Sequence, residues 1–227
     1  MNKAYRIVNV KKLLILIGMT VVLPGLVLAG DTKERLLKLR YEENYSPTWE
    51  ETIALFGQLD KAFKEARLLE AGTTDCGKPL HTFIISNDQE FDPEKVKASG
   101  KTVLLVNNGI HPGEPEGIDA SLLFAEDLLR NHEQMGRWLD EVVVVIIPVY
   151  NIGGALNRSA YNRSGQATPY ETGFRGNYAN LDLNRDFTKC DSENARSFTQ
   201  IFHQWDPDVF LDTHTTNGSD HQYSITL

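Results

Sequence analysis

The chain has 227 residues, of which 41% are hydrophobic and 24% are charged. That is enough apolar sequence for one sizeable core, so a single globular domain is expected. Residues 1–29 hold four basic residues and no acid, and the remainder carries 19 basic against 31 acidic side chains, a net charge of −12. A domain this acidic argues against nucleic acid and anionic membranes as partners.

Residues 1–29 have the composition of a secretory signal peptide. A basic start precedes an apolar run from Leu13 to Leu28, and Val27-Leu28-Ala29 is the kind of small-residue exit that signal peptidase cleaves. A membrane anchor is the alternative, because the run with its flanks approaches the length of a bilayer span. The glycines and the proline inside the run favour removal. We therefore expect an exported protein, periplasmic or extracellular, with no stable membrane association after cleavage.

Helical and strand patterns alternate along residues 45–227, which we interpret as one domain preceded by an N-terminal extension, residues 30–44. Helical spacing predicts helices from Trp49 to about Leu69, from Glu114 to about Leu129 and from Ser192 to about Trp205, with Ser46 or Thr48 capping the first. Apolar runs predict strands at 81–86, 102–107, 141–148 and 209–212. A loop is expected over residues 151–180.

This alternation of helices with fully apolar strands indicates an α/β fold. Strands of that kind are buried on both sides, so we expect a mixed, largely parallel twisted sheet with helices on both faces. Cys76 and Cys190 could form a disulfide after export, but two separated thiols leave their pairing open.

The ten residues from Asn107 to Glu116 read NNGIHPGEPE and follow an apolar run. His111 and Glu114 are three positions apart where a helix is expected to begin, so their side chains project to one side and can bind one cation. Imidazole with carboxylate suits zinc, which in catalytic sites takes three protein ligands and an open position. An H-x-x-E pair is a common chance pattern, but this one lies at a strand end between glycines and prolines.

A third ligand is expected after the last predicted strand. His214 follows that strand by two positions, and ligands in open α/β sheets gather beyond the carboxyl ends of strands. A single histidine there is more often bonded to backbone. Two strand-end histidines together with Glu114 favour a zinc site made of His111, Glu114 and His214.

Asn184 and Arg185 lie in the segment LDLNRDF, residues 181–187. An adjacent amide and guanidinium offer planar, forked donors, which suit recognition of a free carboxylate. An ordinary Arg–Asp surface pair explains the same residues equally well.

The ordered set of His111-x-x-Glu114, Asn184-Arg185 and His214 resembles the zinc carboxypeptidases of the carboxypeptidase A type. About seventy residues separate the first ligand from the Asn-Arg pair, and about thirty separate that pair from the last histidine. The resemblance extends from about Tyr45 to the end of the sequence. It implies a fold of the zinc-dependent exopeptidase type, zinc on the two histidines and the glutamate, and the substrate's terminal carboxylate on Asn184 and Arg185.

Two further roles follow from this resemblance. Asp182 matches the family's aspartate behind the first zinc histidine, a position that fixes the imidazole tautomer and raises its basicity. The family also polarises the scissile carbonyl with an arginine upstream of the Asn-Arg pair. Arg163 fits that role by spacing, with Arg158 and Arg175 as alternatives.

The sequence departs from the family after its last zinc ligand. Family members carry a glutamate general base and a substrate-capping tyrosine well downstream of that histidine, whereas this sequence ends at Leu227, thirteen residues after His214. We therefore expect an amino-terminal portion of the domain that lacks the base and the C-terminal part of the sheet. Asp220 is a carboxylate within reach by sequence, although nothing in the sequence places it at the metal.

The resulting interpretation is an exported, zinc-dependent metallocarboxypeptidase acting on peptides or cell-wall peptides with a free C-terminal carboxylate. Two alternatives stay open. Aspartoacylase and succinylglutamate desuccinylase are similar around H-x-x-E and D-L-N-R, and they cleave N-acyl amino acids. The chain could also bind zinc without catalysing a reaction.

Overall fold

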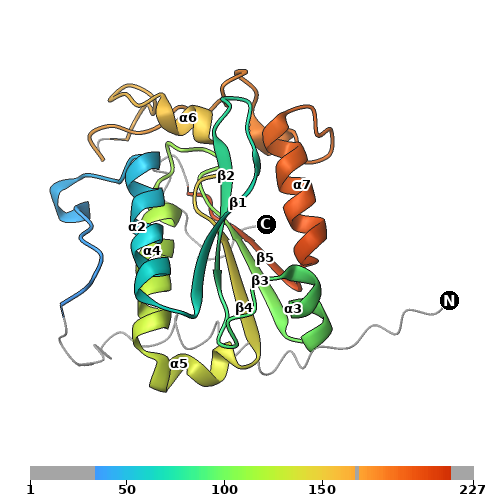
Figure 1. Cartoon of the computed structure of the whole chain (residues 1–227). Coiled ribbons are helices and arrows are strands. Elements are labelled where there is room, and N and C mark those ends of the chain that lie inside the picture. The colour runs from blue at the N-terminus through green and yellow to red at the C-terminus, as the bar shows by residue number, and fades with distance from the viewer. Residues whose placement is uncertain (1–33, 167–168, 216–227) are drawn as a thin grey trace, which may run out of the picture. The chain divides into compact units, whose positions relative to one another are not determined.

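The computed structural model of the chain describes residues 34–166 and 169–215, apart from the side chains of residues 132–135. Within the part from Arg35 onward, five strands form one sheet in the order β1-β2-β4-β3-β5 (Figure 1). β2 is antiparallel to both of its neighbours, whereas β4, β3 and β5 pair in parallel, so four of the five strands point the same way. The expected mixed, largely parallel α/β sheet is confirmed. The strands are β1 (Ala66–Thr73), β2 (Pro79–Ile85), β3 (Thr102–Asn107), β4 (Val142–Ile147) and β5 (Val209–Asp212).

Helices cover both faces of this sheet. α2 (Trp49–Ala62) and α4 (Glu116–Arg130) lie on one face, whereas α3 (Pro93–Ser99) and α7 (Glu193–Trp205) lie on the other (Figure 1). α5 (His132–Leu139) follows α4. None of the helices in the described part of the chain is long and apolar enough to cross a membrane.

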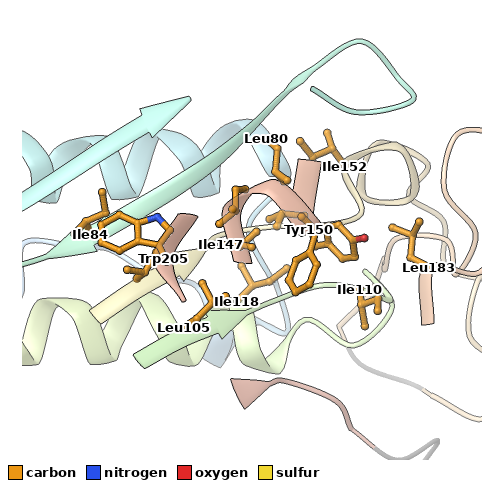
Figure 2. Close-up of a cluster of buried hydrophobic side chains, with 14 of the residues drawn as sticks. Leu80, Ile84, Leu105, Ile110, Ile118, Ile147, Tyr150, Ile152, Leu183 and Trp205 are labelled. Atoms are coloured by element: carbon orange, nitrogen blue, oxygen red, sulfur yellow. The ribbon is translucent and has the colours of Figure 1, made fainter. Parts of the chain in front are cut away.

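The core is divided by the sheet into two clusters because side chains alternate along each strand. On β3, Leu105 packs into the cluster beneath α7, and Val106 packs into the cluster beneath α2 and α4. Figure 2 shows the first cluster, in which Tyr150 and Trp205 lie among buried aliphatic side chains. Each fully buried Val, Leu or Ile contributes about 1.5–3 kcal/mol relative to its exposed state, so these two clusters hold the central strands in register.

Most of the predicted elements are present, and the first helix is the main error. α2 begins at Trp49 with a capping box between Thr48 and Glu51, as expected, but it ends at Ala62 instead of about Leu69. Residues 66–73 form β1 and pair with β2. These residues include good helix formers, so the backbone pairing with β2 overrides their local propensity.

The expected strands at 102–107 and 209–212 have the predicted bounds, and Ser192 caps α7. α4 begins at Glu116, two residues later than expected. The stretch 151–180, expected to be a loop, contains the short helix α6 (Ile152–Leu156). The elements α3 and α5, the 3-10 helix η1 (Tyr41–Glu43) and the 3-10 helix η2 (Leu183–Arg185) were not predicted.

Residues just before the expected domain start also contact the fold. Backbone N–H groups of Leu36 and Leu37 donate to the carboxylate of Glu126 at 2.6 and 3.2 Å, and Leu37 is buried. Cys76 and Cys190 are both free thiols. The expected signal peptide, residues 1–29, lies outside the described residues.

Asp119 on α4 links that helix to the residues just before α2. Its carboxyl accepts a hydrogen bond of 2.9 Å from Ser46, and burial raises its pKa to about 6. The pKa of an aspartate in the unfolded chain is about 3.9. Protonation of Asp119 therefore contributes its whole stabilisation of the fold below about pH 4. It is lost as the pH rises through about 6.

We therefore expect Asp119→Asn, which removes the charge and keeps an acceptor for Ser46, to raise the free energy of unfolding at pH 8 by about 1–2 kcal/mol. At pH 4 the gain should vanish. Urea unfolding at both values measures this, with Glu42→Gln at an exposed site as the control. An equal gain at both pH values would mean that packing, not ionisation, is responsible.

Candidate metal centre

The candidate site lies where the parallel strands β3 and β5 end. Asn107 and Asp212 are register partners at those ends, and the Asn107 side-chain amide donates to Asp212 at 3.2 Å. Beyond them, the Thr213 hydroxyl donates to the Asn108 side chain at 3.0 Å. These contacts bring the ring centroids of His111 and His214 to 5.2 Å, although His214 follows His111 by 103 positions in the sequence.

His111 and Glu114 are joined by a tight turn rather than by the first turn of a helix. The Glu114 N–H donates to the His111 carbonyl at 2.9 Å, and α4 begins only at Glu116. Gly113 at the tip must lack a side chain, because a Cβ there would lie 2.6 Å from Cδ of Arg163. The turn therefore produces the predicted convergence of the two side chains, but by a different backbone conformation.

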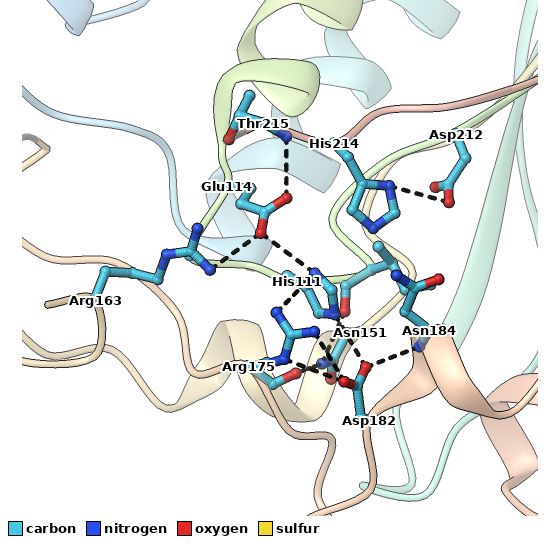
Figure 3. Close-up of polar contacts among 12 residues, drawn as sticks. His111, Glu114, Asn151, Arg163, Arg175, Asp182, Asn184, Asp212, His214 and Thr215 are labelled. Carbon is cyan, nitrogen blue, oxygen red and sulfur yellow. Dashed lines mark hydrogen bonds and ion pairs between the residues drawn. The ribbon is translucent and has the colours of Figure 1, made fainter. Parts of the chain in front are cut away.

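The three predicted metal ligands come together. One ligand atom from each of His111, Glu114 and His214 lies within 4.8 Å of the other two (Figure 3). His111 and Glu114 are buried, with side chains 2% and 4% exposed, whereas the His214 side chain is 31% exposed. The set is therefore open to solvent on the side of His214, which leaves room for the open position of a catalytic zinc site.

Asp182 contacts the first histidine as the resemblance implied. Its Oδ1 lies 3.0 Å from Nε2 of His111 and accepts the Asn184 N–H at 3.0 Å, while its Oδ2 accepts two hydrogen bonds from Arg175 at 3.1 and 2.9 Å. Burial favours a raised pKa, but the bonds from His111 and Arg175 outweigh it and hold the pKa of Asp182 below its usual value. An ionised Asp182 accepts a proton-bearing Nε2, so Nδ1 of His111 presents its lone pair.

That lone pair faces a carboxylate. Nδ1 of His111 is 3.3 Å from Oε1 of Glu114, whose other oxygen accepts the Thr215 N–H at 3.1 Å. Burial favours the neutral acid, but contacts with His111, the Thr215 N–H and Arg163 lower the pKa of Glu114 to about 2. The Nδ1 lone pair of His111 and the ionised carboxylate of Glu114 are both ligand groups that zinc binds. The residues present therefore fit a zinc ion.

His214 is oriented by a second carboxylate, a contact that the sequence analysis missed. Its Nδ1 lies 3.2 Å from Oδ2 of Asp212, and burial raises the pKa of that aspartate. Each histidine of the set thus has its own carboxylate, Asp182 for His111 and Asp212 for His214. An acid two positions before a strand-end histidine is the signal that could have found it.

The three candidate arginines separate into two groups. Arg163 lies at the site, with Nη1 3.0 Å from Oε1 of Glu114 and a side chain 9% exposed. Arg175 is also there, bonded to Asp182 and 3.4 Å from Nδ1 of His111. Arg158 instead donates to three backbone carbonyls, of Ser46, Pro47 and Glu171, and so ties the loop to the start of α2.

Asn184 and Arg185 lie beside the metal ligands on the 3-10 helix η2, which Asp182 caps through its bond to the Asn184 N–H. Figure 3 shows Asn184 next to Asp182. Arg185 is exposed, and its guanidinium donates to the Asn184 carbonyl at 2.9 Å. The pair is thus attached to the site through a residue that touches a ligand. Asp220, the carboxylate considered as a base, lies outside the described residues.

Asn151 is a supporting residue that the sequence analysis missed. Its fully buried side chain donates to the carbonyls of Ile110 and Arg175 at 3.2 and 3.0 Å and accepts the Gly154 N–H at 2.9 Å. It therefore joins the residue before His111 to the loop that carries Arg175 (Figure 3). An asparagine four positions after the apolar strand β4 and two positions before a pair of glycines is the only sequence signal of this role.

Comparison with known proteins identifies the family of this chain. A family model described as zinc carboxypeptidase matches residues 53–220. The chain belongs to the zinc carboxypeptidase family. Carboxypeptidase 2 of Trichophyton rubrum is 24% identical over 117 residues, which cover 52% of this chain and 19% of that protein. The chain thus spans about a fifth of the length of the curated relatives that it matches.

Solved structures show the same fold. Carboxypeptidase A from Helicoverpa armigera matches with a TM-score of 0.59 and 20% identity, over 92% of this chain and 54% of that one. A metallo-carboxypeptidase from Pseudomonas aeruginosa, in complex with (2-guanidinoethylmercapto)succinic acid, has a TM-score of 0.56 and 20% identity, over 78% and 42% of the two chains.

The ligand assignment predicts about one zinc per chain in metal analysis of the purified protein. His111→Ala and His214→Ala should each lose it. Asp182→Asn should keep the site but weaken zinc binding by roughly 10–100-fold, because Nε2 loses its ionised partner. His203→Ala, at an exposed position on α7, is the matched control. Full zinc occupancy in both ligand variants would show that the metal is bound elsewhere.

Proposed function

We propose that this chain carries the metal-binding part of a zinc-dependent metallocarboxypeptidase that hydrolyses C-terminal residues of peptides. The observation that carries the proposal is the linkage between the His111–Glu114–His214 set and the Asn184-Arg185 pair, which meet through Asp182. A metal set alone suits many hydrolases. Forked donors beside it favour a substrate with a carboxylate near the bond to be cleaved.

The residues would share the chemistry in the following way. Bound zinc supplies polarisation of the scissile carbonyl and lowers the pKa of a bound water towards neutrality. Asp182 keeps the Nδ1 lone pair of His111 available, as Asp212 orients His214. Arg163, already at the buried end of the site, would stabilise the charge that develops on the carbonyl oxygen.

The substrate class follows from the donors and from the family. Asn184 and Arg185 would hold the free α-carboxylate of a peptide or cell-wall peptide, which positions the preceding bond at the metal. The match to the zinc carboxypeptidase family supports peptides over the small N-acyl amino acids of the aspartoacylase type. The alternative of a zinc-binding protein without catalysis predicts ligand binding but no peptide hydrolysis, so a turnover assay separates it from the proposed enzyme.

This assignment predicts that peptides with a free C-terminus bind more tightly than the same peptides amidated. Arg185→Lys should reduce that preference roughly tenfold or more although the charge is kept, because an ammonium cannot form two parallel bonds to a carboxylate. Calorimetric titration of the zinc-loaded wild-type and variant chains measures the affinity for the free-acid peptide and for the amidated peptide. Arg196→Lys, an exposed arginine paired with Glu193, is the matched control. Equal affinity for acid and amide would remove the carboxypeptidase assignment.

We also propose that the protein is exported. The basic start, apolar run and small-residue exit of residues 1–29 support cleavage after Ala29. Amino-terminal sequencing of protein from the periplasm or medium should then begin at Gly30. Membrane-bound protein that still begins at Met1 would identify the segment as an anchor instead.

A further inference from the structure

The Glu114 oxygen that faces His111 also contacts a guanidinium. Oε1 is 3.3 Å from Nδ1 of His111 and 3.0 Å from Nη1 of Arg163 (Figure 3). A second guanidinium, that of Arg175, is 3.4 Å from the same Nδ1. Positive charge therefore lies against both atoms that form the buried half of the metal site.

Arg163 is built into this position. Its side chain is 9% exposed, and it passes over Gly113, where a Cβ would lie 2.6 Å from its Cδ. Gln166, three residues further along the same loop, donates to the Gly113 carbonyl at 3.2 Å. The loop is thus fastened to the turn between the two ligands, so Arg163 reaches Glu114 without crossing solvent.

The ion pair and a metal need the same carboxylate. A buried carboxylate is strongly unfavourable without a partner, and Arg163 supplies one. A divalent cation held by Glu114 would add two positive charges beside a guanidinium in a place where solvent screens weakly. Arg163 and the metal are therefore expected to oppose each other.

We propose that Arg163 is a competing countercation of the metal site. Its guanidinium pairs with Oε1 of Glu114 and aims that carboxylate at His111, and its charge lowers the affinity of the site for zinc. This inference rests on the proposed zinc function. It predicts that removing the charge of Arg163 strengthens zinc binding. If Arg163 only positioned Glu114, removing it would weaken zinc binding instead.

The test compares Arg163→Met, Arg163→Lys and the surface control Arg196→Met with the wild-type chain. Zinc dissociation constants come from competition with a chromophoric chelator, and thermal unfolding is followed without metal. We expect Arg163→Met to bind zinc about tenfold or more tightly and to unfold at a lower temperature when metal-free. Arg163→Lys, which keeps the charge, should stay close to wild type in both, as should Arg196→Met.

Arg163→Gln keeps a donor for Glu114 without the charge, so it gives the same comparison if Arg163→Met does not fold without metal. Unchanged or weaker zinc binding in these neutral variants, with zinc binding intact in the wild type, overturns the inference alone. A wild-type chain that binds no zinc overturns the proposed function and the inference together.

Discussion

The parallel pairing of β3 with β5 is the constraint on which the rest of the site depends. Its last register pair, Asn107 with Asp212, sets the two chain exits side by side. A shift of one residue would turn every β5 side chain to the other face and move His214 away from His111. Hydrogen bonds between side chains at the exits add to the backbone pairing, since Asn107 donates to Asp212 and Thr213 donates to Asn108. The metal geometry is therefore a consequence of strand register.

Charge pairing decides how the ligands are oriented within that frame. Each imidazole contacts a carboxylate, and the buried carboxylate of Glu114 contacts a guanidinium. A surface ion pair is worth about 0–1 kcal/mol, but an unpartnered buried charge is unfavourable by several kcal/mol. The arrangement around Glu114 is thus strongly enforced, whereas the exposed contact of Arg185 with its neighbouring carbonyl leaves that guanidinium available for other partners.

The ligand set could be read from the sequence because it follows apolar runs with a clear pattern. β3 and β5 appear with the predicted bounds, so His111 and His214 could be placed at strand ends without a structure. The turn between His111 and Glu114 could not be predicted from the sequence, because i, i+3 spacing brings side chains together in a tight turn as well as in a helix. The supporting residues were also hidden. No local sequence pattern predicts that the Asn151 side chain donates to carbonyls 41 and 24 residues away.

The same limit applies to β1 and to the choice among arginines. Residues 66–73 carry helix formers, and only their pairing with β2 makes them a strand. Spacing favoured Arg163 over Arg158 and Arg175, and the fold brings both Arg163 and Arg175 to the ligands. Long-range contacts decide such cases, and they are absent from local sequence patterns.

Metal binding and the edge of the sheet are coupled through the last ligand. Among the described residues, β5 pairs on one side only, and Phe210 and Leu211 are 39% and 50% exposed. This four-residue strand carries His214 directly after it, and the Thr215 N–H bonds Glu114 across the site. A cation shared by His111, Glu114 and His214 would join β5 to the better buried β3. Because such a site does not exist in the unfolded chain, its binding free energy adds to folding free energy. The least supported strand of the described sheet is therefore the one that a bound metal would stabilise most.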